Sequence, residues 1–169
     1  LALTLKEKKE VFDFFLKNKE KQLTSTNNWN YLNNSIYKDF LYELFITDDS
    51  HISFLSLDNK IIAAHLGYIY NQTFMYLFPV YDKDFSNFSP GNILLLNLIN
   101  SFFHKGGNEI DFTIGDETYK KKLSNKKEKI YYKNLSLNFK GSLIKVIIEF
   151  FKIIKEVKII KHIYQKIKY

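Results

Sequence analysis

The chain has 169 residues, of which 46% are hydrophobic, and this is enough apolar material for a globular domain with a sizeable core. It contains no cysteine and its four histidines show no ligand spacing, so a disulfide framework and a metal site are not expected. Most of the net charge of +7 lies in residues 140–169, which hold eight lysines and two glutamates; the sequence has no arginine, which argues against bidentate recognition of nucleic acid.

The first predicted element is a helix that begins at the capping-box pattern Thr4-Leu5-Lys6-Glu7 and fades near Leu23. A polar, Asn-rich loop follows at 24–34. Ser35 can cap a second helix, which ends before Ser50. The apolar face of this second helix is expected to consist of Ile36, Phe40, Leu41, Leu44 and Phe45.

Three strands are predicted next, at 51–57, 61–70 and 73–80. Asp58-Asn59 and Asn71-Gln72 separate them, and these residue types suit two-residue turns because several of them tolerate a positive φ angle. Three strands joined by such short turns form an antiparallel meander.

The helix predicted at 90–105 has a signal at each end, with Ser89 as N-cap, Pro90 at the first helical position and Gly106-Gly107 as the stop. A strand at 109–113, a short helix near 117–123, a strand at 129–137 and a long basic helix from Ser142 follow. We expect the strands 73–80 and 109–113 to be parallel, joined by the crossover helix.

A strand, loop, helix, strand and polar turn in this order can hold a phosphorylated carrier. The free backbone N–H groups at the start of the helix attract an anion. The alternative is an ordinary helix cap with no ligand.

This order of elements resembles the GNAT acyltransferase core after its first strand. Three segments resemble the cellulose-biosynthesis-type (CelD-like) acetyltransferases: IIAAHLG at 61–67, SPGNILL at 89–95 and DFTIGDETYK at 111–120. That family is similar to the Fem-type transferases, which add amino acids to peptidoglycan precursors. The resemblance implies an α/β (α+β) fold whose mixed sheet has an antiparallel meander and a crossover helix. The resemblance covers roughly residues 5–140. The first strand of the GNAT core has no counterpart in this sequence, which begins at Leu1, so a fragment is expected.

The resemblance also implies where the donor binds. Ser89, Gly91, Asn92 and Ile93 stand where GNAT folds direct backbone N–H groups at the pyrophosphate of an acyl carrier. The loop lacks the Gly-x-Gly/Ala pattern that is usual in acetyl-CoA binders. The donor is therefore left open between acyl-CoA and another acyl carrier, and a charged tRNA is the one nucleic acid considered.

Three residues are candidates for catalysis on the same resemblance. The Tyr119 phenol can protonate a leaving thiolate or alcohol, or can be a core aromatic. Lys120 can stabilise an oxyanion or hold a phosphate, or can be a solvated lysine. Asp111 can orient Lys120 or act as a base, or can bind turn amides. His65 is either a further candidate base or a core histidine.

The expected organisation is a GNAT-like domain at 1–140, truncated at its N-terminus, and a basic amphipathic helix at 141–169. The function expected is acyl or aminoacyl transfer to an amine or hydroxyl of a cell-envelope sugar or polysaccharide precursor. The alternative is a catalytically silent binding module for an envelope-biosynthesis partner. The basic helix packs on protein or binds an anionic membrane surface. No apolar run reaches the roughly 18 residues of a membrane span, and a cytoplasmic location is expected, at the inner face of the membrane if the helix binds there.

Overall fold

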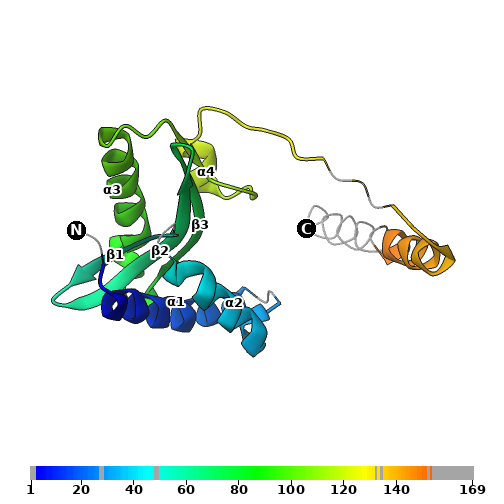
Figure 1. Cartoon of the computed structure of the whole chain (residues 1–169), viewed down its shortest axis with the longest axis horizontal. Helices are drawn as coiled ribbons and strands as arrows, with labels where there is room; N and C mark the ends of the chain where they lie inside the picture. Colours follow the sequence, from blue (N-terminus) through cyan, green and yellow to red (C-terminus); the bar gives the residue numbers. More distant parts are fainter. Residues whose placement is uncertain are drawn as a thin grey trace, which may run out of the picture. The chain divides into compact units, whose positions relative to one another are not determined.

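The computed structural model describes residues 3–26, 29–47, 50–131, 133, 135–151 and 153. It consists of two compact units, residues 1–124 and 125–169, which we describe separately. The first unit is a four-stranded sheet with α1 and α2 on one face and α3 on the other (Figure 1).

Both predicted N-terminal helices are present. The capping box of α1 (Leu5–Ser25) is complete, because the Thr4 hydroxyl accepts from the Glu7 amide while the Thr4 amide donates to the Glu7 carboxylate at 2.7 Å. The cap of α2 (Ser35–Ile46) is Asn34 and not Ser35, since the Asn34 side-chain oxygen accepts from the Ile36 amide at 2.9 Å. A short 3₁₀ helix, η1 (Tyr31–Asn33), lies between them.

The antiparallel meander is confirmed. Its strands are β1 (Ser50–Leu57), β2 (Lys60–Tyr70) and β3 (Thr73–Tyr81), paired in that order. Both residues of the Asp58-Asn59 turn and of the Asn71-Gln72 turn have positive φ angles, between 47° and 63°. Turns of this kind match the twist of the strands that they join, which is why hairpins form at these two places.

The crossover connection is also confirmed. The helix α3 (Pro90–His104) leads to β4 (Glu109–Asp111), which pairs with β3 in parallel. Gly106 and Gly107 end α3 as predicted, because their amides donate to the carbonyls of the last turn. β4 is shorter than predicted. The short helix α4 (Thr118–Leu123) follows.

The core lies in two layers. Between α1/α2 and the sheet, the buried side chains include Phe15, Leu32 and Phe45. Between α3 and the sheet they include Phe74, Tyr76 and Leu95. The α2 face differs from its prediction, since Leu41 and Phe45 are buried but Ile36 and Phe40 are 72% and 60% exposed.

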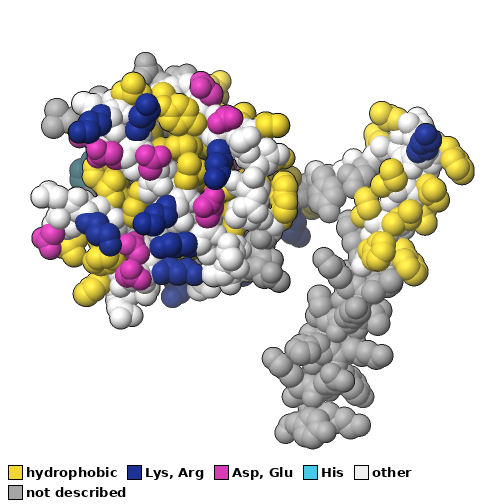
Figure 2. Space-filling model, turned by 90° about the horizontal axis from the view of Figure 1, so that it is seen from below, with side chains coloured by type: hydrophobic (Ala, Val, Ile, Leu, Met, Phe, Trp, Pro, Cys, Tyr) yellow, Lys and Arg dark blue, Asp and Glu magenta, His cyan; other side chains and the backbone are white. Residues whose placement is uncertain are grey.

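The second unit differs from its prediction. The described residues between 129 and 137 form no strand, and the C-terminal helix begins at Phe139, before Ser142. An isolated strand would leave its backbone donors and acceptors without a sheet. The helix is described at 139–151 and 153, with apolar side chains over much of its surface (Figure 2). Residues 152 and 154–169 of the predicted tail lie outside the described residues.

Candidate active site

The candidate site lies where β3 and β4 separate. The two strands pair through Thr73–Met75 and Glu109–Asp111, whereas β3 continues from Tyr76 to Tyr81. In open α/β sheets, ligands bind in the crevice at the carboxyl ends of the strands. We call the space beyond these paired residues the wedge.

A β-bulge in β3 directs side chains at the wedge. The pairing of β2 with β3 shifts by one residue between Leu66 and Tyr68. As a result Phe74 and Tyr76 pack on the α3 side, whereas Phe78 packs on the α1/α2 side. Bulges commonly re-aim side chains next to active sites. Here the bulge turns Phe78 to the α1/α2 side, while Tyr76 stays on the α3 side and contacts Phe112 and Tyr119.

Tyr119 lies in an aromatic cluster at the wedge. Its ring centroid is 6.1 Å from that of Phe112 and 6.3 Å from that of Tyr76, both in edge-to-face contact. Burial, with a smaller contribution from the negative charge of Glu117, raises the pKa of the Tyr119 phenol to about 12. The phenol therefore keeps its proton at neutral pH and is able to donate it.

Lys120 is buried, whereas Lys121 and Lys122 are exposed. Its ammonium Nζ donates to the Ile114 carbonyl at 2.8 Å and pairs with the Glu117 carboxylate at 3.0 Å. The solvated-lysine alternative therefore applies to its neighbours and not to Lys120. A cation fixed in a dry environment interacts more strongly with developing negative charge than one in water.

Gly115 makes room for this ion pair. Its φ angle of +140° is one that side-chain-bearing residues rarely adopt. A Cβ atom there would also clash with the Glu117 carboxylate and would lie 2.7 Å from Lys120 Nζ. The glycine of the Asp-Phe-x-x-Gly segment is thus explained by the close approach of the Lys120 side chain.

Asp111 occupies the end of β4. Its Oδ1 atom accepts a hydrogen bond from the Thr113 amide at 2.6 Å, and Thr113 has a φ angle of +59°. This is the turn-binding alternative considered for Asp111. The bond fixes the direction in which the chain leaves β4 toward Tyr119 and Lys120.

The start of α3 differs from a standard cap. Ser89 has a φ angle of +50° and its side chain makes no cap hydrogen bond. The amides of Asn92 and Ile93 both donate to the Ser89 carbonyl, at 3.0 and 3.2 Å. Gly91 lies beside the Tyr81 ring. An anion bound here would therefore compete with the Ser89 carbonyl for the Asn92 amide hydrogen.

The predicted residues form two groups along β3. Parallel pairing puts the Asp111–Lys120 group and the α3 start toward the same edge of the sheet. The α3 start follows Tyr81, which lies about 20 Å along β3 from Met75 at 3.3 Å per residue. The two groups are thus separated along β3 and do not form one compact site.

One residue whose pKa depends on the Glu117 charge, Lys19, was not predicted from the sequence. Burial lowers the pKa of Lys19, on α1, against an opposing effect of the Glu117 charge. Lys19 also donates to the Gln22 side chain at 2.9 Å. No local motif marks Lys19, because its relation to Glu117 depends on the packing of segments far apart in the sequence.

His65 is fully buried on the α3 side of β2 and is stacked on Tyr76, with ring centroids 4.2 Å apart. Both of its ring nitrogens, His51 Nε2 and Ser53 Oγ are buried without a hydrogen-bond partner among the described residues. His65 is thus a core histidine, but not one whose polar atoms are satisfied. In the described part of the chain, no three His, Cys, Asp or Glu side chains are grouped as metal ligands.

The mixed sheet with its antiparallel meander and crossover helix is the fold expected of an acyltransferase, and the family comparison agrees. Residues 1–121 match the family model of the acetyltransferase (GNAT) domain. The chain belongs to this family of acyltransferases. No curated protein matches it.

Solved structures show the same fold at low sequence identity. An aminoglycoside acetyltransferase from an uncultured soil metagenomic sample, in complex with sisomicin, is 13% identical (TM-score 0.51; 78% of this chain and 92% of that one are covered). A Staphylococcus aureus GNAT family acetyltransferase is 16% identical (TM-score 0.51; 75% and 93%). A Trypanosoma brucei acetyltransferase is 10% identical (TM-score 0.50; 80% and 97%).

Proposed function

We propose that the domain transfers an acyl group from acyl-CoA to an amine or hydroxyl of a cell-envelope sugar or polysaccharide precursor. The observation that carries the proposal is the buried Lys120 ammonium beside Tyr119, at the edge of the wedge. The three segments that resemble the CelD-like family support the envelope acceptor.

The residues present fit an acyl-CoA donor. Among the described residues, β3 has no strand partner on the β4 side beyond Met75, so its Tyr76–Tyr81 edge can pair with an extended ligand. Gly91 and Asn92 at the α3 start would hold the pyrophosphate. The thioester of the donor supplies an acyl group already activated for attack.

The chain's own residues then divide the work. Lys120 stabilises negative charge that develops on the carbonyl oxygen, because its position is fixed by Ile114 and Glu117 before any ligand binds. Tyr119 donates its proton to the leaving thiolate, and the proton released by the attacking amine or hydroxyl returns to the phenolate through solvent. Asp111 holds the turn that presents both.

A sugar acceptor is in line with one structural neighbour, the aminoglycoside acetyltransferase that was crystallised with sisomicin. The test is an acyl-transfer assay on the full chain, with acetyl-CoA and longer acyl-CoAs against amino sugars, neutral sugars and lipid-linked envelope precursors. Transfer to a sugar nucleophile that exceeds hydrolysis of the donor is expected. Donor binding without transfer to any acceptor would instead support the catalytically silent binding module.

The second unit suggests an additional role at an anionic membrane surface. Its described helix exposes nine large apolar side chains and carries Lys140 and Lys145: Phe139, Leu143, Ile144, Val146, Ile147, Ile148, Phe150, Phe151 and Ile153. A helix of this kind can lie in the interface of a bilayer. In the described part of the chain, no helix is both long enough and apolar enough to cross a bilayer.

Vesicle sedimentation tests this role. Changing Lys152, Lys155 and Lys158 to Glu should release the chain from anionic vesicles, because each lysine near such a surface contributes about 1 kcal/mol. The matched control changes the exposed Lys6, Lys9 and Lys121 to Glu. Equal release by both triple variants, or no binding by the parent chain, would leave protein packing as the better account.

A further inference from the structure

A second depression lies outside the wedge. It has a volume of about 600 Å³ and is lined by the C-terminal half of α1, by η1 and by the first residue of the 3₁₀ helix η2 (Lys83–Phe88). This volume is in the range of small-molecule sites. None of its residues has a role in the proposed chemistry.

The depression is positively charged. Lys17 and Lys21 lie one turn apart on the same face of α1, and Lys83 faces them from η2. Glu20 is the one acidic side chain among its lining residues, and Lys38 of α2 pairs with it at 2.9 Å. The three lysines therefore outweigh the negative charge at this place.

Its neutral side chains add directional hydrogen-bonding groups. The Thr24 hydroxyl donates to the Glu20 carbonyl at 2.9 Å, so its oxygen is presented as an acceptor. Asn30 donates to the side-chain oxygen of Asn33 at 3.1 Å, which leaves the Asn33 amide hydrogens to serve a ligand. Leu32, fully buried between these two asparagines, fixes η1 to the core.

The depression lies near the carboxyl end of β3. Lys83 follows the carboxyl end of β3 by two residues. Lys19, on a different face of the same segment of α1, responds to the charge of Glu117 beside Lys120. A ligand held by Lys17, Lys21 and Lys83 thus lies on the α1 side of the strand that carries the wedge.

We propose that this depression binds the anionic, hydroxyl-bearing part of the acceptor, which makes the acceptor a phosphorylated sugar. Three ammonium groups match a phosphate, and the Thr24 and Asn33 groups match sugar hydroxyls. This inference rests on the proposed function, because it assigns the acceptor of that reaction.

Equilibrium binding to the full chain tests the proposal without turnover. The probes are glucosamine 6-phosphate, glucosamine, inorganic phosphate and acetyl-CoA. We expect the sugar phosphate to bind at least tenfold more tightly than glucosamine or inorganic phosphate alone. Lys21→Gln and Lys83→Gln should each weaken its binding by about tenfold, the size of one charge-assisted hydrogen bond.

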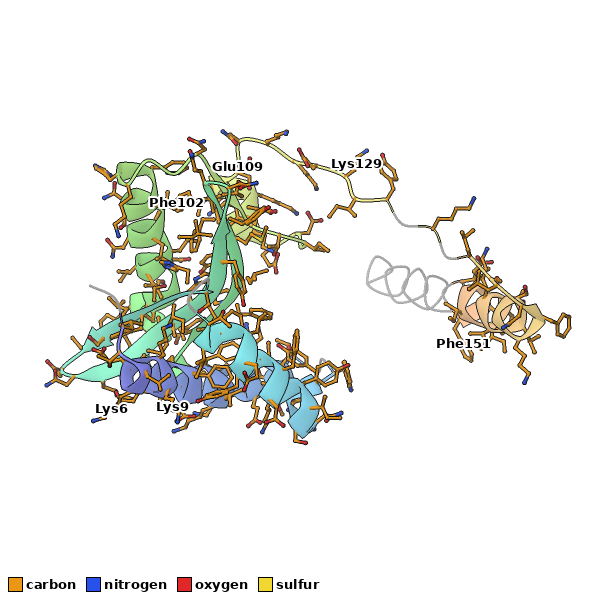
Figure 3. All side chains as sticks on the ribbon, viewed as in Figure 1. Lys6, Lys9, Phe102, Glu109, Lys129 and Phe151 are labelled. Atoms are coloured by element: carbon orange, nitrogen blue, oxygen red, sulfur yellow. The ribbon has the colours of Figure 1, made fainter. Side chains whose placement is uncertain are left out.

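The matched control is Lys9→Gln, near the N-terminal end of the same helix (Figure 3). At a rise of 1.5 Å per residue, Lys9 lies about 18 Å along the helix from Lys21. It should bind every probe as the parent does. Acetyl-CoA should bind equally to all variants. If acetyl-CoA loses affinity in parallel with the sugar phosphate, the depression belongs to the donor and the proposal is overturned.

The remaining outcomes are equally decisive. Equal binding of glucosamine and its phosphate would overturn the anionic acceptor, and equal binding of inorganic phosphate would overturn the sugar. If the sugar phosphate binds as expected but no acyl transfer occurs with acetyl-CoA, the proposed function fails while the binding site stands.

Discussion

The two faces of the sheet are built differently. On the α1/α2 face the buried side chains are nearly all apolar, and the buried Asn18 amide is satisfied by the Phe14 carbonyl at 2.9 Å. On the α3 face, His51, Ser53 and His65 bury polar atoms that have no hydrogen-bond partner among the described residues.

Each unsatisfied buried group of this kind costs about 1–3 kcal/mol. Such costs are tolerated where a site requires them. On the α3 face, His65 stacks on Tyr76, and Tyr76 contacts Tyr119 at the wedge. We infer that the apolar packing on the α1/α2 face stabilises the fold enough to offset the cost of the unsatisfied polar groups on the α3 face.

The largest effect on the free energy of unfolding is expected from a substitution in the core of the α1/α2 face. Phe45 is fully buried and packs edge to face on Phe78, with ring centroids 5.6 Å apart. Phe45→Ala should lower the free energy of unfolding by about 3–5 kcal/mol, measured by urea denaturation. Phe40→Ala, on the same helix but at a side chain that is 60% exposed, is the control and should change it by less than about 0.5 kcal/mol. Equal losses would mean that the face is not packed as described.

The next effect concerns catalysis at the wedge. Lys120→Ala should lower kcat/KM by about 10²–10³-fold, which is typical of losing one fixed oxyanion donor. Lys121→Ala should lower kcat/KM far less, because the Lys121 side chain is 59% exposed. Its ion pair with Asp116, at 3.6 Å, lies on the surface, where such pairs contribute little.

Lys120 also holds the 114–117 turn, so stability must be measured beside the rate. Loss of stability with an unchanged rate per folded molecule would make Lys120 a support of the turn alone. Small and equal losses of rate at Lys120 and Lys121 would remove the catalytic assignment.

A somewhat smaller effect is expected at Tyr119. Tyr119→Phe keeps the ring contacts with Tyr76 and Phe112 but loses the proton, so the rate should fall by about a hundredfold without loss of stability. Because the phenol pKa is about 12, its ionisation should not reduce kcat below about pH 11 in the parent. A rate unchanged by the substitution would leave Tyr119 as a core aromatic.

Local signals predicted most of the first unit. The Thr4 capping box, the Asp58-Asn59 and Asn71-Gln72 turns, and the Gly106-Gly107 stop are encoded by neighbouring residues, and each lies where it was expected. The parallel pairing of β3 with β4 followed from the crossover helix. One prediction that failed was the strand at 129–137, since a weak alternation of apolar residues does not show whether a partner strand is available.

The site was less predictable than the fold. The motif indicated Tyr119 and Lys120 as candidates, but burial of Lys120 depends on its contacts with Ile114 and Glu117. The positively charged depression joins Lys21 to Lys83, and no sequence pattern relates residues from α1 and η2. Contacts of this kind follow from tertiary packing and become visible only in the folded chain.

Substitution of His65 is expected to have the smallest effect on stability at neutral pH. It is also the most direct test of the difference between the two faces. Burial, and to a smaller degree the nearby His51, lowers the pKa of His65 well below 6.5, its usual value in an unfolded chain. Below about pH 6.5 the unfolded chain therefore binds a proton that the folded chain excludes, so the stability of the parent should fall as the pH falls.

His65→Phe removes this proton site and two unsatisfied nitrogens while it keeps a ring to stack on Tyr76. The variant should lose less stability between pH 7 and pH 5 than the parent, measured by urea denaturation at each pH. The control is His104→Gln, at an exposed histidine of α3, which should keep the parent's pH dependence. If His65→Phe also keeps the pH dependence of the parent, another group controls the acid sensitivity. Burial of His65 would then not be the energetic cost that distinguishes the α3 face.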